Sequence, residues 1–248
     1  MECAPMSRLQ KYAGVPKTLF LQKPSALLLL PILREVKLYT PDSWEALLHV
    51  KDLVEEIDDK KIPGDLVETG CGQGGAGTFM AWVSKENGSH RRTWLFDSFE
   101  DEPEMIEIGT TALGLFSVNT HDVVASVIGP LPRDSPRYLA QKLQVVGQVR
   151  IMKGDPDISI PASKKILRQI SLLYVQGTNY DLVLFILRNL YDLVSPGGYV
   201  VINNYDAHTA RKALYEFFFE QGISPFLYNR DLNVGAYFQK TEEDPEAV

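Results

Sequence analysis

Short apolar runs alternate with amphipathic stretches along most of this chain, and this alternation constrains its fold more than any other feature. The runs that predict strands are residues 65–69, 93–99, 148–155, 170–177, 199–206 and 235–240. The stretches with helical spacing are residues 42–61, 77–87, 138–146, 180–194, closed by "SPGG", and 208–222. Strands that alternate with helices form mostly parallel sheets with helices on both faces. The pattern therefore predicts an α/β fold with a Rossmann-like, doubly wound sheet.

The length of 248 residues suits one α/β domain with an attachment better than two full domains. Residues 1–40 mix prolines, basic residues and an apolar run, and they are predicted to form an N-terminal helical appendage that serves as a lid or an oligomer contact. Residues 41–248 then form the main domain. Residues 101–137 show no clear period, which is typical of a lid or a substrate loop.

Charge and composition argue against several functional classes. A net charge of −7 and a pI near 5.2 disfavour nucleic-acid binding, which needs a basic footprint. Cys3 and Cys71 lie far apart, so neither a disulfide framework nor a cysteine metal site is expected, and a cytoplasmic location is predicted. No signal peptide is evident. The apolar run 25–33 is too short for a membrane span and contains Pro31. It is expected to pack on the body or on a partner, with a peripheral membrane contact as the alternative.

A glycine-rich turn follows the strand over residues 65–69. Gly70, Gly72 and Gly75 stand between that strand and the next helix, where glycine allows a tight turn and a close approach of a ligand to the backbone. The next strand ends in Asp97, and an acid there can accept hydrogen bonds from ribose hydroxyls. Together these residues predict an adenosine-type pocket. The alternative is that the glycines serve packing alone and that Asp97 caps a turn.

Glu68 favours S-adenosylmethionine (SAM) over a dinucleotide in this pocket. It precedes the first glycine at the strand end, and a carboxylate that faces the pocket attracts a cationic ligand and repels a pyrophosphate. The end of the chain runs helix, strand, helix and a terminal strand over residues 235–240, which predicts the late β-hairpin usual in SAM-dependent methyltransferases.

Several ordered motifs then make the sequence resemble a known family. The motifs are "IPGDLVETG", "TWLFDSFE", "ISLLY", "LYDLVSPGGYVVINNYDA" and the closing "GAYF", and they cover roughly residues 38–240. In these the chain resembles the macrocin-type O-methyltransferases, which methylate sugars of mycinamicin and novobiocin. The resemblance implies a class I SAM fold, SAM as methyl donor, often a homo-oligomer, and a magnesium ion that holds the acceptor hydroxyl. The predicted SAM pocket comprises Glu68, Gly70, Gly72, Gly75, Asp97, Ser98 and Asp155.

The chain departs from this family where the metal is expected. Gln176 and Thr178 stand in place of aspartates after one strand, and Asn203 and Asn204 replace an aspartate pair after the next. Residues 154–156 read "GDP" where the family has "GWF". Magnesium is a hard dication that proteins hold with carboxylates, whereas an amide brings no negative charge. We therefore expect no magnesium site. The alternative is a weak site that uses Asp181 or Asp206.

The amides nevertheless keep the size and the hydrogen-bonding capacity of the acids they replace. We expect Gln176, Asn203 and Asn204 to contact a polar, neutral acceptor. Without a metal the acceptor proton needs a general base, or the nucleophile must already be reactive. The candidate bases are His208 at a helix start and His121 in the insertion, ahead of Asp155 and Tyr180.

Three functions remain open on these grounds. The first is a metal-independent methyltransferase that acts on a small molecule of secondary metabolism. The second is an enzyme that keeps SAM but catalyses a cyclisation or rearrangement, in which the fixed positive charge and the amides stabilise a polarised transition state. The third is a non-catalytic SAM-binding module. A dehydrogenase is disfavoured by Glu68.

Overall fold

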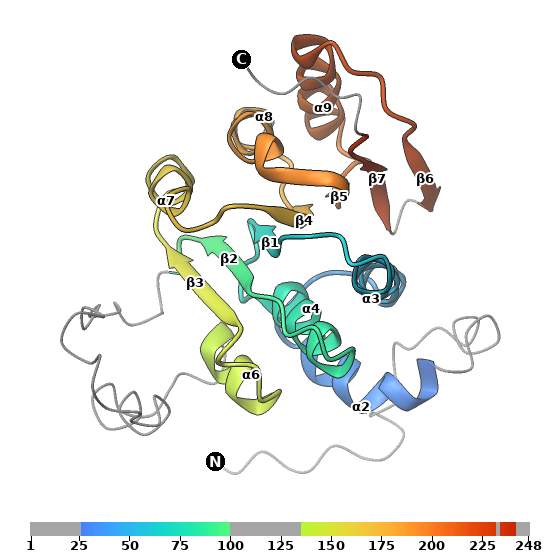
Figure 1. The fold of residues 1–248 in the computed structure, drawn as a ribbon, viewed down its shortest axis with the longest axis vertical. Coiled ribbons are helices and arrows are strands. Elements are labelled where there is room, and N and C mark those ends of the chain that lie inside the picture. The colour runs from blue at the N-terminus through green and yellow to red at the C-terminus, as the bar shows by residue number, and fades with distance from the viewer. Residues whose placement is uncertain (1–25, 100–134, 232–233, 242–248) are drawn as a thin grey trace, which may run out of the picture.

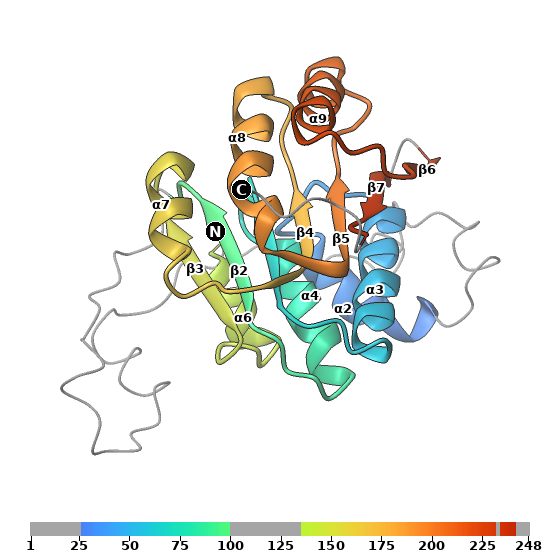
Figure 2. The same ribbon diagram turned by 45° about the horizontal axis from the view of Figure 1, so that its top comes forward.

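A seven-stranded sheet forms the centre of the molecule, with strand order β3-β2-β1-β4-β5-β7-β6. The computed structural model describes residues 26–99, 135–231 and 234–241. The strands are β1 (Asp65–Thr69), β2 (Thr93–Asp97), β3 (Val149–Lys153), β4 (Ile170–Val175), β5 (Val194–Ile202), β6 (Tyr228–Asp231) and β7 (Gly235–Gln239). Strands β1 to β5 pair in parallel, whereas β7 runs antiparallel to β5 and to β6. The predicted Rossmann-like sheet and its late hairpin are confirmed (Figure 2).

Helices cover both faces of this sheet (Figure 1). The helices are α2 (Ala26–Val36), α3 (Trp44–Asp59), α4 (Gly75–Glu86), α6 (Pro136–Lys142), α7 (Pro156–Ser163), α8 (Tyr180–Leu190) and α9 (His208–Gln221), with a 3-10 turn η2 (Tyr191–Leu193) after α8. The first four pack on one face around a core that includes Leu66 and Val201. The last three pack on the other face around a core that includes Val67 and Val200. Alternate strand residues thus enter opposite cores, as a buried parallel sheet requires.

The order of the strands defines where a ligand is expected. From β1 the chain moves outward to β2 and β3, and it then returns to add β4 and β5 on the other side of β1. In open α/β sheets, ligands bind at such a reversal, beyond the carboxyl ends of the strands. The ends of β1, β2, β4 and β5 therefore frame the candidate site.

Ser43 caps the start of α3. Its Oγ accepts a hydrogen bond of 2.9 Å from the N–H of Ala46. A side-chain cap of this kind satisfies one of the free N–H groups of the first turn. The Asp42 side chain instead contacts Tyr174 and Asn203.

The element prediction was wrong in the region of residues 195–198. These residues, "SPGG", lie inside β5 and do not separate the preceding helix from the strand. The register of β4 against β5 shifts between Ile170 and Leu172, and this irregularity accommodates the proline and the glycines within the strand. The sequence analysis also missed α7, which contains Pro161, and β6, which has only four residues.

Helix α2 belongs to the packed body of the protein. Leu33 and Val36 are buried in the core with α3 and α4, whereas Leu28 on the outer side is 86% exposed. No helix in the described ranges is long and apolar enough to cross a membrane. The roles predicted for residues 1–40 and for the insertion 101–137 stay predictions, since residues 1–25 and 100–134, with His121 among them, lie outside the described residues.

Candidate active site

Two adjacent strands bring the predicted amides to one edge of the sheet. Backbone pairing continues one residue beyond the strands, because the N–H of Gln176 donates to Thr69 and the N–H of Asn203 donates to the carbonyl of Val175, at 3.0 Å each. Gln176 follows Tyr174 by two residues, so both side chains point to the face that carries α3 and α4. The sequence analysis placed these amides together, and the strand register agrees.

Glu68 lies directly beneath this edge and is fully buried. Its Oε2 accepts a hydrogen bond of 2.6 Å from the N–H of Gly77 in α4, and its Oε1 accepts one of 2.5 Å from Nε2 of Gln176. Burial raises the pKa of the Glu68 carboxyl well above its ordinary value, and the nearby charge of Asp42 raises it further. Both oxygens thus have protein partners, and a direct contact of Glu68 with a cationic ligand stays a prediction.

Asp42 is a second buried carboxyl group, and it contacts Tyr174 in β4 and Asn203 after β5. It is 4% exposed, its Oδ2 accepts a hydrogen bond of 2.9 Å from the hydroxyl of Tyr174, and its Oδ1 accepts one of 2.8 Å from Nδ2 of Asn203. Burial raises the pKa of Asp42, while the hydrogen bonds from Tyr174 and Asn203 act in the opposite direction. No local pattern in the sequence indicates these partners, because Tyr174 and Asn203 lie 132 and 161 positions from Asp42 along the chain.

Asn204 and Thr178 form hydrogen bonds that connect the loops around this edge. The Oδ1 of Asn204 accepts a hydrogen bond of 2.9 Å from the N–H of Gly177, which ties the end of β5 to the loop after β4. The carbonyl of Thr178 accepts a hydrogen bond from the hydroxyl of Thr209 in α9. The carbonyl oxygen of Asn204 is therefore already engaged by the protein, and only its amide nitrogen is left to contact an acceptor.

On the other side of β1, Asp97 closes the glycine turn. Its Oδ2 accepts a hydrogen bond of 2.7 Å from the N–H of Gly72, and its Oδ1 accepts one of 2.7 Å from the N–H of Ser98. Gly72 is exposed with φ 55°, and a Cβ added there would meet nothing within 4 Å. The space in front of Gly72 and Asp97 is thus open to a ligand.

Gly75 has a different role in the same turn. Its N–H donates to the carbonyl of Tyr39 at 3.1 Å, and a Cβ at this position would lie 2.7 Å from the Tyr39 carbonyl carbon. Gly70 has a φ of 68°, and a Cβ added there would lie 2.7 Å from the backbone carbonyl oxygen of Gln176. These two glycines permit close packing of the chain on itself. Their predicted contact with the cofactor remains a prediction.

The comparison with known proteins agrees with this arrangement. The family model described as macrocin-O-methyltransferase (TylF) matches residues 43–240. The chain belongs to this family. The match extends over β1 to β7, so that both the glycine turn and the edge with the amides lie within it.

Two curated relatives and one solved structure are similar to this methyltransferase. The tetracenomycin-C 4'-O-methyltransferase of Streptomyces olivaceus, whose substrate name includes a dimethoxy-rhamnosyl group, is 29% identical over 76% of this chain and 70% of its own length. The demethyldecarbamoylnovobiocin O-methyltransferase of Streptomyces niveus is 28% identical over 79% of this chain and 73% of its own length. The structure of the O-methyltransferase NovP matches with a TM-score of 0.65 at 26% identity, over 82% of this chain and 83% of that one.

These matches establish the general activity. The protein is a SAM-dependent methyltransferase of the class I fold, its cofactor is SAM, and its relatives serve natural-product biosynthesis. The open space at Gly72 and Asp97 fits this cofactor. An exposed glycine turn and a carboxylate beside it can face the adenosine moiety.

The residues of this methyltransferase do not fit the magnesium ion that the resemblance implied. The donor set contributed by Gln176, Asn203 and Asn204 has no charge, and two of the amides direct their nitrogens toward Glu68 and Asp42. Proteins bind magnesium with at least one carboxylate oxygen directed at the ion. The two nearby carboxylates are instead turned to protein donors.

The remaining predicted residues lie farther from the amides. Asp155 is exposed just before α7, next to Gly154, whose N–H donates to the carbonyl of Asp97 at 3.0 Å. His208 is the exposed first residue of α9 and has no hydrogen bond to Asn203 or Asn204 within the described ranges. It lines a hollow of about 500 Å³ together with Arg211, Lys212, Tyr215 and Glu216. The roles of Asp155 and His208 therefore stay predictions.

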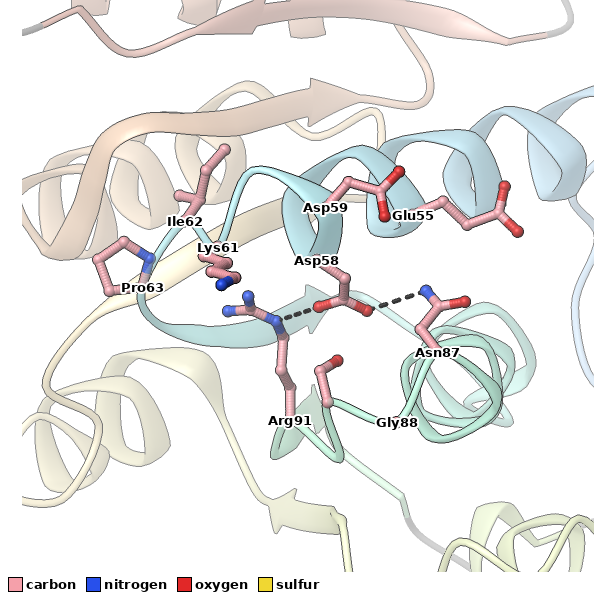
Figure 3. A pocket seen from close by; sticks show the side chains of 10 residues that line it. Glu55, Asp58, Asp59, Lys61, Ile62, Pro63, Asn87, Gly88 and Arg91 are labelled. Atoms are coloured by element: carbon pink, nitrogen blue, oxygen red, sulfur yellow. Dashed lines mark hydrogen bonds and ion pairs between the residues drawn. The ribbon is translucent and has the colours of Figure 1, made fainter.

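A larger hollow of about 560 Å³ lies at the opposite edge of the sheet, near the start of β1 (Figure 3). In it, Asp58 accepts hydrogen bonds from Arg91 Nε at 2.5 Å and from Asn87 at 2.9 Å. These contacts join the end of α3 to the segment after α4. Because ligands bind at the carboxyl ends of such strands, we assign this hollow no role in catalysis.

Proposed function

We propose that this methyltransferase transfers a methyl group from SAM to a sugar hydroxyl of a natural product, without magnesium. The observation that carries the proposal is the arrangement of Gln176 and Asn203 at the expected metal positions. Each is a neutral amide, and each donates its NH₂ group to a buried carboxylate of the protein. An amide so engaged presents a neutral hydrogen-bond acceptor to the site, which suits a hydroxyl group better than a dication.

The class of acceptor rests on the relatives. The enzyme from S. olivaceus is named for a compound that carries a rhamnosyl group, and the enzyme from Micromonospora griseorubida is named as a mycinamicin III 3''-O-methyltransferase. The chain covers 70% and 79% of the length of these two enzymes. We therefore propose a glycosylated small molecule as the acceptor.

The reaction needs a proton acceptor in addition to the methyl donor. The hydroxyl oxygen forms a bond to the methyl carbon as the carbon–sulfur bond breaks, and S-adenosylhomocysteine is released. The hydroxyl proton passes to a base, since no metal is proposed to acidify it. His208 and His121 are the histidines proposed for this role, the former because it begins the helix that follows Asn203 and Asn204.

We further propose that the enzyme is a homo-oligomer in the cytoplasm. Leu27 and Leu28 in α2 are 53% and 86% exposed, Leu38 just after it is 69% exposed, and exposed apolar side chains are often found at interfaces. The proposed cytoplasmic location rests on the two distant cysteines, Cys3 and Cys71, for which no disulfide framework is expected.

A product assay with chelator tests the proposed function. The purified protein is incubated with SAM and either demethyldecarbamoylnovobiocin or mycinamicin III, with EDTA or with added magnesium chloride. We expect equal amounts of methylated acceptor and S-adenosylhomocysteine in both conditions. Methylation only with magnesium would contradict the metal-free mechanism. A converted acceptor with intact SAM would support the non-methylating alternative, and SAM binding without any conversion would support a binding module.

A further inference from the structure

The two amides at the sheet edge share one arrangement. Gln176 donates its Nε2 to Glu68, and Asn203 donates its Nδ2 to Asp42. In both pairs the NH₂ group of the amide is the donor, and an oxygen of the carboxyl group is the acceptor. The opposite atoms, Gln176 Oε1 and Asn203 Oδ1, have no hydrogen-bond partner among the described residues. The carboxylates thus fix which atom each amide presents to the site.

Residues 176 and 203 lie next to each other on neighbouring strands. Val175 pairs with Ile202, and the ladder continues to Gln176 and Asn203 through the 3.0 Å bond between Asn203 and Val175. Neighbouring strands lie about 4.8 Å apart. Each of these neighbouring residues thus has a side-chain carbonyl oxygen that accepts no hydrogen bond from the part of the chain that the structure describes.

Asp42 comes from outside this sheet edge. It precedes α3, and it reaches the ends of both strands through Tyr174 and Asn203. Tyr174 is fully buried, so its hydroxyl has few alternatives to Asp42, and it holds the carboxylate in place while Asn203 donates to the other oxygen. Asp42 is itself nearly inaccessible, which suits a residue that acts through Asn203 and does not touch the acceptor.

We propose that Asp42 is a positioning residue of the acceptor site, which orients the Asn203 carbonyl so that it and the Gln176 carbonyl receive hydrogen bonds from hydroxyl groups of the acceptor. This inference rests on the proposed function, because it concerns the same acceptor. The site keeps a negative charge, but the charge is located on Asp42 and not on the residue at the strand end. Positions 42 and 203 then form a coupled pair in which one residue is an acid and the other an amide.

The coupling predicts that acid and amide can be exchanged. Asn203→Asp alone places two carboxylates in direct contact, which disfavours ionisation of both. Asp42→Asn alone leaves two amides whose relative orientation is no longer determined. The double variant Asp42→Asn/Asn203→Asp restores a donor and an acceptor, since the amide introduced at position 42 can donate to the carboxylate introduced at position 203. That carboxylate still accepts hydrogen bonds from a hydroxyl group.

The test compares the wild-type protein with these three variants in two binding titrations. Methyl α-L-rhamnopyranoside is titrated in the presence of S-adenosylhomocysteine, and SAM is titrated separately by calorimetry. We expect each single variant to bind the rhamnoside about tenfold more weakly than wild type. In the double variant, the affinity for the rhamnoside should recover to within about threefold of wild type. SAM affinity is expected to change less than about twofold in Asp42→Asn. A purely structural role for Asp42 would lower both affinities together.

Three results would overturn the inference. They are unchanged rhamnoside affinity in Asp42→Asn, no recovery in the double variant, or no rhamnoside binding to the wild type. If Asp42→Asn does not fold, the partly exposed position 203 provides the test, and an Asn203→Ala protein that binds rhamnoside as tightly as wild type contradicts the proposal equally. Rhamnoside binding that depends on Asp42 but leads to no methylated product would refute the proposed function and leave this inference standing.

Discussion

Removal of the Tyr174 hydroxyl is the sharpest test of the buried network over β4 and β5. The hydroxyl donates to Asp42 at 2.9 Å, and Asp42 is 4% exposed, so water cannot replace the lost donor in Tyr174→Phe. A hydrogen bond to a charged group contributes about 1.5–3 kcal/mol. We expect the free energy of unfolding to fall by about 2 kcal/mol, which lowers Tm by about 4–8 °C for a chain of this size.

Tyr199→Phe is the matched control. Its hydroxyl donates to Oε1 of Glu56 at 2.8 Å, but the Glu56 side chain is 42% exposed and also pairs with Lys60. Solvent can replace this donor, so the loss is expected to stay below about 1 kcal/mol. Urea denaturation of both variants gives the two values. Equal losses, or a loss below about 0.5 kcal/mol in Tyr174→Phe, would refute the reasoning that the charge on Asp42 makes the buried hydroxyl important.

The pH dependence of Tyr174→Phe gives an independent check. Burial raises the pKa of Asp42 above its ordinary value of 3.8, so folding disfavours the ionised form, and this group's effect on stability becomes more favourable as the pH falls. Loss of the Tyr174 donor raises this pKa further. The stability difference between the variant and wild type should thus be largest at neutral pH and shrink toward pH 3.8. A difference that is constant with pH would show that the hydroxyl does not act on the ionised carboxylate.

Three further predictions concern Gly75 and Gly72 of the glycine turn and Cys71 within it. Gly75→Ala, whose Cβ would lie 2.7 Å from the Tyr39 backbone, should cost about 1–3 kcal/mol of stability. Gly72→Ala meets open space and should cost only about 1–2 kcal/mol for its left-handed backbone, but should weaken SAM binding in calorimetry; equal SAM affinity in Gly72→Ala and wild type would contradict a ligand at this turn. Burial, with Glu68 and Asp97 adding to it, raises the pKa of the Cys71 thiol well above its ordinary value. Iodoacetamide should leave Cys71 unmodified in the native protein and modify it in urea, as peptide mass spectrometry can show; rapid modification of the native protein would contradict its burial.

Local pattern was enough to predict most of the fold. Strands β1 and β2 and helix α3 were predicted nearly at their observed bounds, because apolar period and flanking glycine, proline or capping residues act over a few positions. Local sequence patterns also predicted the glycine turn near Asp97. They supported the family resemblance, which the comparison confirms. They failed at residues 195–198, where a proline and two glycines lie in a strand whose irregular pairing with β4 only the sheet reveals.

The contacts of the acceptor edge depended on tertiary structure. The sequence by itself determined that residues 176 and 203 are amides at the ends of neighbouring strands, and hence that the site lacks the usual carboxylates. Only the folded chain decided what those amides do, because their partners come from other segments: Asp42 lies 161 positions from Asn203 and 132 from Tyr174, and Glu68 lies 108 from Gln176. A buried carboxylate takes whichever donors the packing brings to it, and no spacing in the sequence encodes which donors those are.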